Sequence, residues 1–561
     1  MEIRSDRRAV RLDRDREGLL GPVIGFGHAR AFWLGSAACT AGVLLHLPMY
    51  LGAARMYYQL TGMRPDAPMF AGTVLIVIGL VATTYGLIPR RSPGTSTPRI
   101  RVSALDDAPI RPAHISLLIV MALAVTVDAM KPIALSFVLP GFTTEYDLKS
   151  ALNPHGHLPA ALLPLAGIGG TVIGSLVWGW LGDRIGRRAS ILLAGVLFST
   201  TAICGAMPGF SWNLLMCFLM GLGVGGMLPI AFTLLAETIP ARHRGWLMVL
   251  IGGNIAGAYL ITSWLSAELV PHYSWRILWL VQMPTGLLLI ALNRWIPESP
   301  RFLLAQGRTA EARAVLERYG AATLSADPQE PSVKRRSNGR YAMLFHRPYL
   351  GPTGALLFLG LGVGLMTYGF QMWIPTNLQH LGFTAQTADK ILRDSALIGF
   401  LLTIPVALLY GFWSSKRTIV ALGALTAAAL LGFVAAGDSV VQNPGLLNVL
   451  LIVPVWSISS MTAALAAYSA EIYPTHVRSR GAGLSAGAAK TSGVLVISLV
   501  AAAVTTPSIA ITALLGAVPI AIAVLVVALV GVETRQRSLE EITDRRDHSS
   551  PRSTLTEAHS E

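Results

Sequence analysis

Long apolar stretches alternate with short polar segments along nearly the whole chain. A helix needs about 20 mostly apolar residues to cross a bilayer. The alternation of apolar and polar residues that marks outer-membrane strands is not visible. The pattern therefore predicts an all-α integral membrane protein, with spans that begin near residues 31, 69, 115, 158, 189, 213, 246, 275, 350, 395, 417, 446, 481 and 507.

The polar segments divide these fourteen spans into three groups. The central loop contains an amphipathic stretch at 309–320 that ends in glycine and predicts a short helix. The predicted order is a basic N-terminal segment (1–30), a two-helix hairpin (31–89), a linker (90–114), a first six-helix bundle (115–296), a central loop (297–349), a second six-helix bundle (350–531) and a tail (532–561).

Composition narrows the class further. Of 561 residues, 53% are hydrophobic and 13% are charged, which is about half the charged fraction of soluble domains. The 55 glycines and 33 prolines are tolerated in membrane helices, where neighbouring helices satisfy the freed backbone groups. These values exclude a soluble enzyme, a disordered chain and a secreted disulfide scaffold.

The formal net charge of +14 raises the alternative of a nucleic-acid partner. The cations lie in short loops between apolar stretches, however, and alternate loops carry few of them. Such an asymmetry orients a multi-span protein in the cell membrane with its basic loops inside. We therefore expect no nucleic-acid partner, and we expect both termini and the central loop in the cytoplasm.

The two predicted bundles carry an internal repeat. The stretch AETIP at 236–240 is followed by Arg244, and AEIYP at 470–474 is followed by Arg478 and Arg480. Each copy follows the fourth span of its bundle. Two similar halves side by side indicate a transporter whose solute site lies between them, near the middle of the membrane.

A loop in the first bundle has a recognisable sequence. Residues 179–188 read GWLGDRIGRR and join the second and third spans of that bundle. Glycines allow close approach of two helix ends, and arginines can pair with carboxylates across a closing gate. This loop resembles the signature loop of the major facilitator superfamily, which implies two six-helix bundles with a pseudo-two-fold repeat.

Two further segments resemble motifs of the sugar-porter branch of that superfamily. They are PESPRFLL at 297–304 and ETRQRSLEEI at 533–542. The glutamine-rich seventh-span motif of sugar porters is absent, and Ser415 stands where the second signature loop would carry aspartate. The chain therefore resembles relatives of sugar porters that carry organic ions and metabolites, including niacin-type carriers.

The resemblance implies a set of gating residues. In such families their charges pair when the carrier faces outward and separate when it opens inward. The residues that match are Gly179, Asp183, Arg184, Arg187, Arg188, Glu237, Arg244, Glu298, Arg301, Glu471, Arg478 and Glu533.

Charged residues inside predicted spans are candidates for a solute or proton pathway, because charge in hydrocarbon is costly. Asp128 and Lys131 are three residues apart, so a helix places them on one face. A pair that only neutralises itself is the alternative. Lys490 lies about ten residues into its span, about 15 Å deep at 1.5 Å per residue. Snorkelling to the membrane surface is the alternative there.

Polar and aromatic residues in the seventh span of the twelve complete the predicted pathway. Tyr368, Gln371 and Trp373 precede Pro375, which leaves the carbonyl of Gln371 without its helical partner. Arg276 lies near the outer rim, where Trp275 is expected to anchor the membrane interface. No metal, nucleotide or hydrolase signature is present, so we expect no cofactor, no metal and no enzymatic activity.

The combined hypothesis is a secondary active transporter of a small organic solute that works by alternating access and is coupled to protons. The two lysines favour an organic anion or similar small metabolite as the solute. A proton-driven exporter and a non-transporting solute sensor are the alternatives. The two extra spans have no assigned role, and the oligomeric state is open.

Overall fold

The structure is a computed structural model of the whole chain. It describes residues 28–89, 105–321, 340–437, 443–503 and 509–542, apart from 150–152, 154, 375–376, 379–380, 384, 538 and 540. The predicted segments 1–30, 90–114, 297–349 and 532–561 are therefore described only in part, and Pro375 lies outside the described residues.

Within the described residues, fourteen helical stretches are long and apolar enough to cross a membrane. The all-helical membrane fold predicted from the sequence is confirmed. The first two spans form the hairpin, which consists of α2 (Ala29–Leu44), α3 (Leu47–Gly52), η1 (Ala53–Met56) and α4 (Ala67–Leu87).

The next six spans form the N-terminal half. They comprise α5 (Pro112–Glu145), α6 (Leu162–Ile185), α7 (Arg187–Thr200), η3 (Thr201–Ala206), α8 (Phe210–Thr238), α9 (Ala241–Gly252), α10 (Asn254–Tyr273), α11 (Ile277–Leu280), α12 (Met283–Ala291) and η4 (Leu292–Trp295).

The central loop and the last six spans follow. The loop contains α13 (Pro300–Ala305), α14 (Thr309–Arg318) and η5 (Tyr341–Phe345), and α14 occupies the stretch that predicted a short helix. The C-terminal half comprises α15 (Leu350–Leu365), η6 (Met366–Phe370), η7 (Gln371–Trp373), α17 (Ala385–Leu408), η8 (Leu409–Trp413), α18 (Ser415–Ala436), α19 (Pro444–Ile472), α20 (Arg478–Ala503) and α21 (Ile509–Val530).

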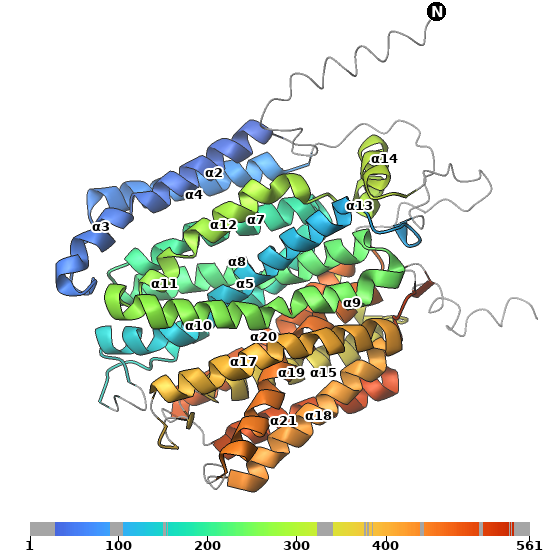
Figure 1. Cartoon of the computed structure of the whole chain (residues 1–561). Coiled ribbons are helices and arrows are strands. Elements are labelled where there is room, and N and C mark those ends of the chain that lie inside the picture. Colours follow the sequence, from blue (N-terminus) through green and yellow to red (C-terminus); the bar gives the residue numbers. More distant parts are fainter. Residues whose placement is uncertain are drawn as a thin grey trace, which may run out of the picture.

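The two halves lie side by side, with the N-terminal half above the C-terminal half in Figure 1. The main contact between them joins α6 to α20, and α9 and α10 of the N-terminal half pack against α17. The hairpin lies on the outer flank of the N-terminal half, where α2 and α4 contact α7 (Figure 1). The hairpin is thus remote from the boundary between the halves.

Local sequence explains several helix boundaries. The side chain of Asp66 accepts a hydrogen bond from the backbone N–H of Met69 at 2.9 Å and caps α4. Asn443 caps α19 in the same way through the N–H of Leu446. The chain between α15 and η7 forms a π-helical turn at Met366–Phe370, a feature that is often found at functional sites.

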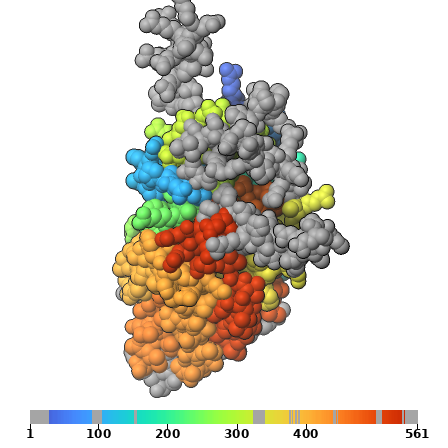
Figure 2. Space-filling model, turned by 90° about the vertical axis from the view of Figure 1, so that its right-hand side faces the viewer, coloured from blue at the N-terminus to red at the C-terminus, as the bar shows by residue number. Residues whose placement is uncertain are grey.

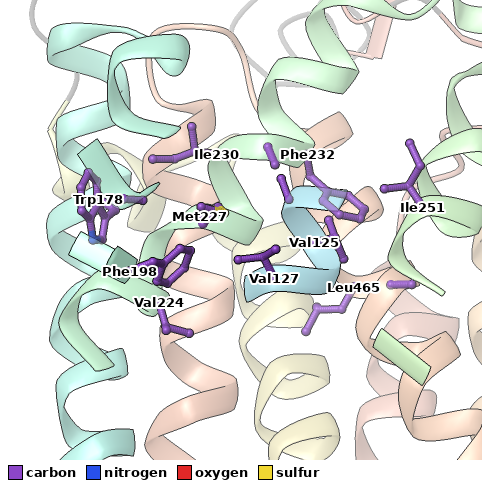
Figure 3. Packing of buried hydrophobic residues seen from close by; sticks show 14 of the residues in the cluster. Val125, Val127, Trp178, Phe198, Val224, Met227, Ile230, Phe232, Ile251 and Leu465 are labelled. Atoms are coloured by element: carbon purple, nitrogen blue, oxygen red, sulfur yellow. The ribbon is translucent and has the colours of Figure 1, made fainter. Parts of the chain in front are cut away.

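Tight apolar packing holds the N-terminal half together. Val125 and Val127 on α5 lie near Phe198, Met227 and other side chains from α7 and α8, as Figure 3 shows. Leu465 on α19 of the C-terminal half lies close to Val125 in the same view. The core therefore continues across the boundary between the halves.

One end of the bundle carries the recognisable motifs. At this end α6, α8 and α19 terminate and α7, α9 and α20 begin. We call it the motif end and the other the opposite end. Figure 2 looks onto the motif end, where the C-terminal segment (red) lies at the boundary between the two halves.

Candidate functional site

The turn between α6 and α7 positions the signature residues. Gly186 has a φ of +105°, a left-handed value that favours glycine, and a side chain there would collide with Glu298. Glu298 accepts a hydrogen bond from the backbone N–H of Arg187 at 2.8 Å and so caps α7. Burial raises the pKa of Glu298 above its ordinary value, although this N–H donation opposes the shift.

Asp183, at the end of α6, connects the two halves. It forms one ion pair with Arg187 of its own half at 3.4 Å and another with Arg480 on α20 at 3.0 Å. The backbone N–H of Ser479 also donates to it, at 3.3 Å. All three charged side chains are buried, so separation of the halves here would remove partners from a buried carboxylate.

Glu237, at the end of α8, is a second junction between the halves. Its carboxylate pairs with Arg187 at 3.0 Å and with Arg478 on α20 at 2.7 Å. Arg187 also donates to the backbone carbonyl of Thr475 in the C-terminal half, at 3.1 Å. One buried carboxylate therefore holds an arginine from each half.

Other predicted gating residues of the N-terminal half stay within that half or at its surface. Arg188 donates to the backbone and side-chain oxygens of Asn293 at 3.2 and 3.1 Å. Arg184 is exposed and lies 4.9 Å from the centre of the Trp180 ring. The structure therefore places Arg184 outside the buried network.

Sequence reasoning missed one member of this network, Asp106. It lies in the linker just before α5, and its carboxylate pairs with Arg244 and, at 3.3 Å, with Arg301. Arg301 also donates to the backbone carbonyl of Glu237 at 3.3 Å. An aspartate in a polar linker reads as a solvated residue, so no signal in the sequence set Asp106 apart.

The glutamate of the repeat in the C-terminal half, Glu471, has different partners from Glu237. Glu471 accepts hydrogen bonds from Tyr410 at 3.1 Å and Thr534 at 2.6 Å. Within the described residues, no cation lies within ion-pair distance of Glu471. The predicted charge pair of Glu471 is therefore not formed in this conformation, because two hydroxyl groups donate hydrogen bonds to its carboxylate instead.

Glu533 is the counterpart of Glu298. It accepts hydrogen bonds from the backbone N–H of Ser415 at 3.0 Å and from the hydroxyls of Ser414 and Ser415, and so caps α18. Burial alone would raise its pKa, but these hydrogen bonds outweigh burial and lower it. Glu533 therefore stabilises a helix start within its own half.

Two glycines allow α6 and α20 to meet closely near the motif end. A side chain at Gly179 would lie 2.8 Å from the backbone oxygen of Ser479, and one at Gly483 would collide with the backbone oxygen of Ser175. The interface between the halves is thus made of backbone contacts beside the ion pairs. Replacement of either glycine would push the two helices apart.

Deeper in the bundle, charged groups from the two halves lie within electrostatic reach of one another. The Lys490 ammonium on α20 donates to the Ser175 hydroxyl at 3.1 Å and to the backbone carbonyl of Gly225 at 3.0 Å, both in the N-terminal half. Asp128 on α5 is only 6% exposed, and its Oδ1 has no hydrogen-bond partner. Lys490 and Tyr368 both lie within electrostatic reach of Asp128.

Lys131 does not join this group, although the helical spacing predicts it on one face with Asp128 as part of a joint site. It is fully buried, and its ammonium donates to the backbone carbonyl of Phe198 at 2.8 Å and to the hydroxyl of Thr201 at 3.0 Å. These partners lie where α7 changes into η3. The long lysine stem turns towards α7, so the helical spacing of three residues did not bring the two charges together.

The remaining seventh-span candidates lie on or after the π-helical turn. The indole N–H of Trp373 donates to the backbone carbonyl of Tyr368 at 3.0 Å, and Gln371 is half-buried. The Trp373 ring is buried against Val496. Trp373 thus stabilises the turn that presents Tyr368.

The opposite end carries a separate buried ion pair. Arg276 pairs with Glu145 at 2.7 Å, and the backbone N–H groups of Leu60 and Thr61 in the hairpin donate to the same carboxylate at 3.0 and 3.2 Å. Trp275 is 4% exposed and donates to Glu145 at 2.9 Å. The prediction of Trp275 as an interface anchor is therefore wrong, because its indole completes this network.

The described residues contain no group of three or more His, Cys, Asp or Glu side chains that could hold a metal ion. The three cysteines, Cys39, Cys204 and Cys217, are buried and free.

Comparison with known families places this architecture in a class. Residues 139–545 match the family described as Sugar (and other) transporter. The chain therefore belongs to this family of multi-pass membrane transporters, within the major facilitator superfamily, and is not an enzyme. The resemblance noted from the signature loop is confirmed.

Several curated relatives are transporters of small molecules. The chain is 26% identical over 403 residues to the niacin transporter NiaP of Acinetobacter baylyi, covering 70% of this chain and 88% of that one. It is 28% identical over 402 residues to the 4-hydroxybenzoate transporter PcaK of the same organism, covering 70% and 85%. A gallate transporter of Pseudomonas putida is 28% identical over 415 residues, covering 71% and 87%.

Solved structures show the same fold. The proton:xylose symporter XylE, bound to 6-bromo-6-deoxy-D-glucose, superimposes with a TM-score of 0.65 at 19% identity, covering 77% of this chain and 99% of that one. The human organic anion transporter MFSD10 gives a TM-score of 0.55 at 14% identity, covering 74% and 100%.

Proposed function

We propose that this chain is a proton-coupled secondary transporter of a small aromatic carboxylate, that it works by alternating access in the cell membrane, and that its motif end faces the cytoplasm. The observation that carries the proposal is that Asp128 and Lys490 come from opposite halves and lie inside the bundle within electrostatic reach of each other, without forming an ion pair.

Lys490 supports an anionic solute. Its ammonium is bound by a hydroxyl and a backbone carbonyl, and within the described residues no carboxylate lies within ion-pair distance of it. Lys490 is half-buried inside the bundle, where a cation without an anionic partner is costly. A solute carboxylate beside Lys490 would supply that partner, and its arrival would compete with the contacts that Lys490 makes across the halves.

Asp128 supports proton coupling. One of its carboxylate oxygens is buried without a hydrogen-bond partner, a state that is costly for an ionised group and less costly for a protonated one. Access of water to Asp128 would change as the halves rock. Protonation on one side and release on the other would then couple proton flow to solute movement.

The relatives support the solute class. Niacin, 4-hydroxybenzoate and gallate, which three of them are named for, each combine an aromatic ring with a carboxylate at neutral pH. Lys490 would bind the carboxylate, and Tyr368 offers an aromatic ring within electrostatic reach of Asp128. Aromatic pairs contribute about 0.5–1.5 kcal/mol beyond their burial.

The motif-end ion pairs support alternating access. Asp183–Arg480 and Glu237–Arg478 join the halves, so this conformation is closed at the motif end. Release of solute there would require both pairs to separate. The basic loops at this end favour the cytoplasmic side by the positive-inside rule.

Reconstitution into proteoliposomes tests the proposal. We expect labelled niacin, 4-hydroxybenzoate or gallate to accumulate at least about tenfold when an inward proton gradient is imposed, and xylose not to accumulate. Accumulation of the solute only when the proton gradient is directed outward would favour the proton-driven exporter. Binding of an acid without transport under any gradient would favour the sensor.

Two variants and a control separate the roles of the charges. Asp128→Asn should abolish gradient-driven accumulation but retain exchange of solute, and Lys490→Gln should lose both. Lys131→Met is the matched control, because Lys131 lies one turn from Asp128 but its ammonium donates to Phe198 and Thr201 instead. Exchange and accumulation by this variant should both persist. Continued accumulation by Asp128→Asn would refute proton coupling through this residue.

A further inference from the structure

The linker that precedes α5 enters the motif end. Asp106 is buried, and its backbone carbonyl accepts a hydrogen bond from the N–H of Ala241 at the start of α9, at 3.0 Å. Its carboxylate pairs with Arg244 and Arg301. A segment outside the twelve-helix repeat therefore supplies a buried anion beside the residues that join the halves.

Comparison of the two copies of the repeat shows which ion pair is missing beside Asp106. Arg244 and Arg478 follow Glu237 and Glu471 at the same spacing in the two copies. Arg478 crosses to the other half and pairs with Glu237 at 2.7 Å. The symmetric contact, from Arg244 to Glu471, is not made, although Arg244 lies within electrostatic reach of that carboxylate.

Asp106 accounts for the missing contact. The guanidinium of Arg244 is engaged by Asp106 and by the backbone carbonyl of Arg537, at 3.3 Å. Glu471 is satisfied by hydroxyls from Tyr410 and Thr534. An arginine that already pairs with one carboxylate is stabilised little by a second carboxylate whose hydrogen bonds are already made.

We infer that Asp106 is a positioning residue of the gate, which holds the Arg244 guanidinium away from Glu471 and prevents a second ion pair, Arg244–Glu471, between the halves. The motif end is then closed by one set of crossed pairs instead of two. Asp106 thereby weakens the closed conformer and shifts the population towards opening. This inference rests on the proposed alternating access.

The segment is anchored so that it can exert this effect. Arg111 donates to the backbone carbonyl of Glu317 at 3.2 Å, and the His114 ring lies edge-on to the Tyr319 ring at 4.8 Å. The end of the linker is thus tied to α14 of the central loop.

Double electron–electron resonance can measure the effect. Spin labels at Gln306→Cys and Arg417→Cys, both exposed, report the separation of the halves at the motif end. The three native cysteines are buried, which favours selective labelling. The measurement is made in nanodiscs at a pH where the parent shows both a short and a long distance.

Asp106→Asn should raise the ratio of closed to open conformers about fivefold or more, the lower range of typical coupling between sites. Asp106→Glu should restore the parent ratio. Asp107→Asn is the matched control, because Asp107 is adjacent and exposed, and it should leave the ratio unchanged. Equal responses of Asp106→Asn and Asp107→Asn, or a shift towards the open conformer, would overturn the inference.

Glu471→Gln tests the same inference in a chain that keeps Asp106. Glu471→Gln alone should leave the ratio of closed to open conformers unchanged. Combined with Asp106→Asn, it should cancel the shift towards the closed conformer, because Arg244 then has no carboxylate with which to pair. A shift caused by Glu471→Gln alone would mean that the Arg244–Glu471 pair already forms, and would overturn the inference. A parent with one distance at every pH would instead refute alternating access.

Discussion

The two halves cap their motif-end helices in the same way but neutralise their buried glutamates differently. Glu298 and Glu533 each accept a backbone N–H at the start of a helix, α7 and α18. Glu237 is held by two arginines, whereas Glu471 is held by two hydroxyls. The two halves thus share the helix-capping contacts within each half. The ion pairs between the halves, in contrast, use the buried glutamate of the N-terminal half and not that of the C-terminal half.

This difference has a physical consequence. A buried carboxylate that two arginines share loses much when one of them leaves, because the remaining charges stay in a low-dielectric site. A carboxylate that is bound by hydroxyls of its own half loses nothing when the halves separate. The ion pairs that join the halves at the motif end are therefore formed by acids of the N-terminal half and arginines of the C-terminal half.

The largest expected effect comes from a comparison of the two repeat glutamates. Glu237→Gln leaves Arg187 and Arg478 without their shared anion and should destabilise the protein by about 3–5 kcal/mol. Glu471→Gln removes only hydrogen bonds to hydroxyls and should cost about 1 kcal/mol. Thermal unfolding of the two purified variants in one detergent measures the difference. Equal losses would show that the halves are not distinct in this respect.

A smaller effect is expected when the missing signature acid is restored. Ser415→Asp places a carboxylate beside the half-buried Glu533, which already caps α18, and should destabilise by about 2 kcal/mol through repulsion between the two like charges. Glu533→Gln in the same chain should recover most of the loss. The thermal midpoints of the single and double variants provide the test, and a more stable Ser415→Asp protein would contradict it.

The smallest effect is expected at Arg184, which shares the signature loop with the buried arginines. Its side chain is exposed, so Arg184→Gln should change stability by no more than about 0.5 kcal/mol. Arg187→Gln is the matched comparison, because Arg187 contacts both Asp183 and Glu237. Similar losses in the two variants would mean that the loop acts through its net charge and not through buried pairs.

The sequence by itself determined the features that depend on local pattern. The fourteen spans follow from runs of apolar residues, because the length of a span is set by the thickness of the bilayer. The helix in the central loop follows from its amphipathic period and terminal glycine. The superfamily follows from the signature loop and the repeat, which are contiguous in the chain.

Tertiary structure alone decided which charges meet. Lys131 and Lys490 are both lysines in apolar spans, yet the first turns towards α7 and the second reaches the other half. Asp106 has a polar neighbourhood in sequence and a buried one in space. The partner of a long side chain depends on which groups the neighbouring helices place within its reach. Helical spacing specifies only the helix face on which that side chain lies.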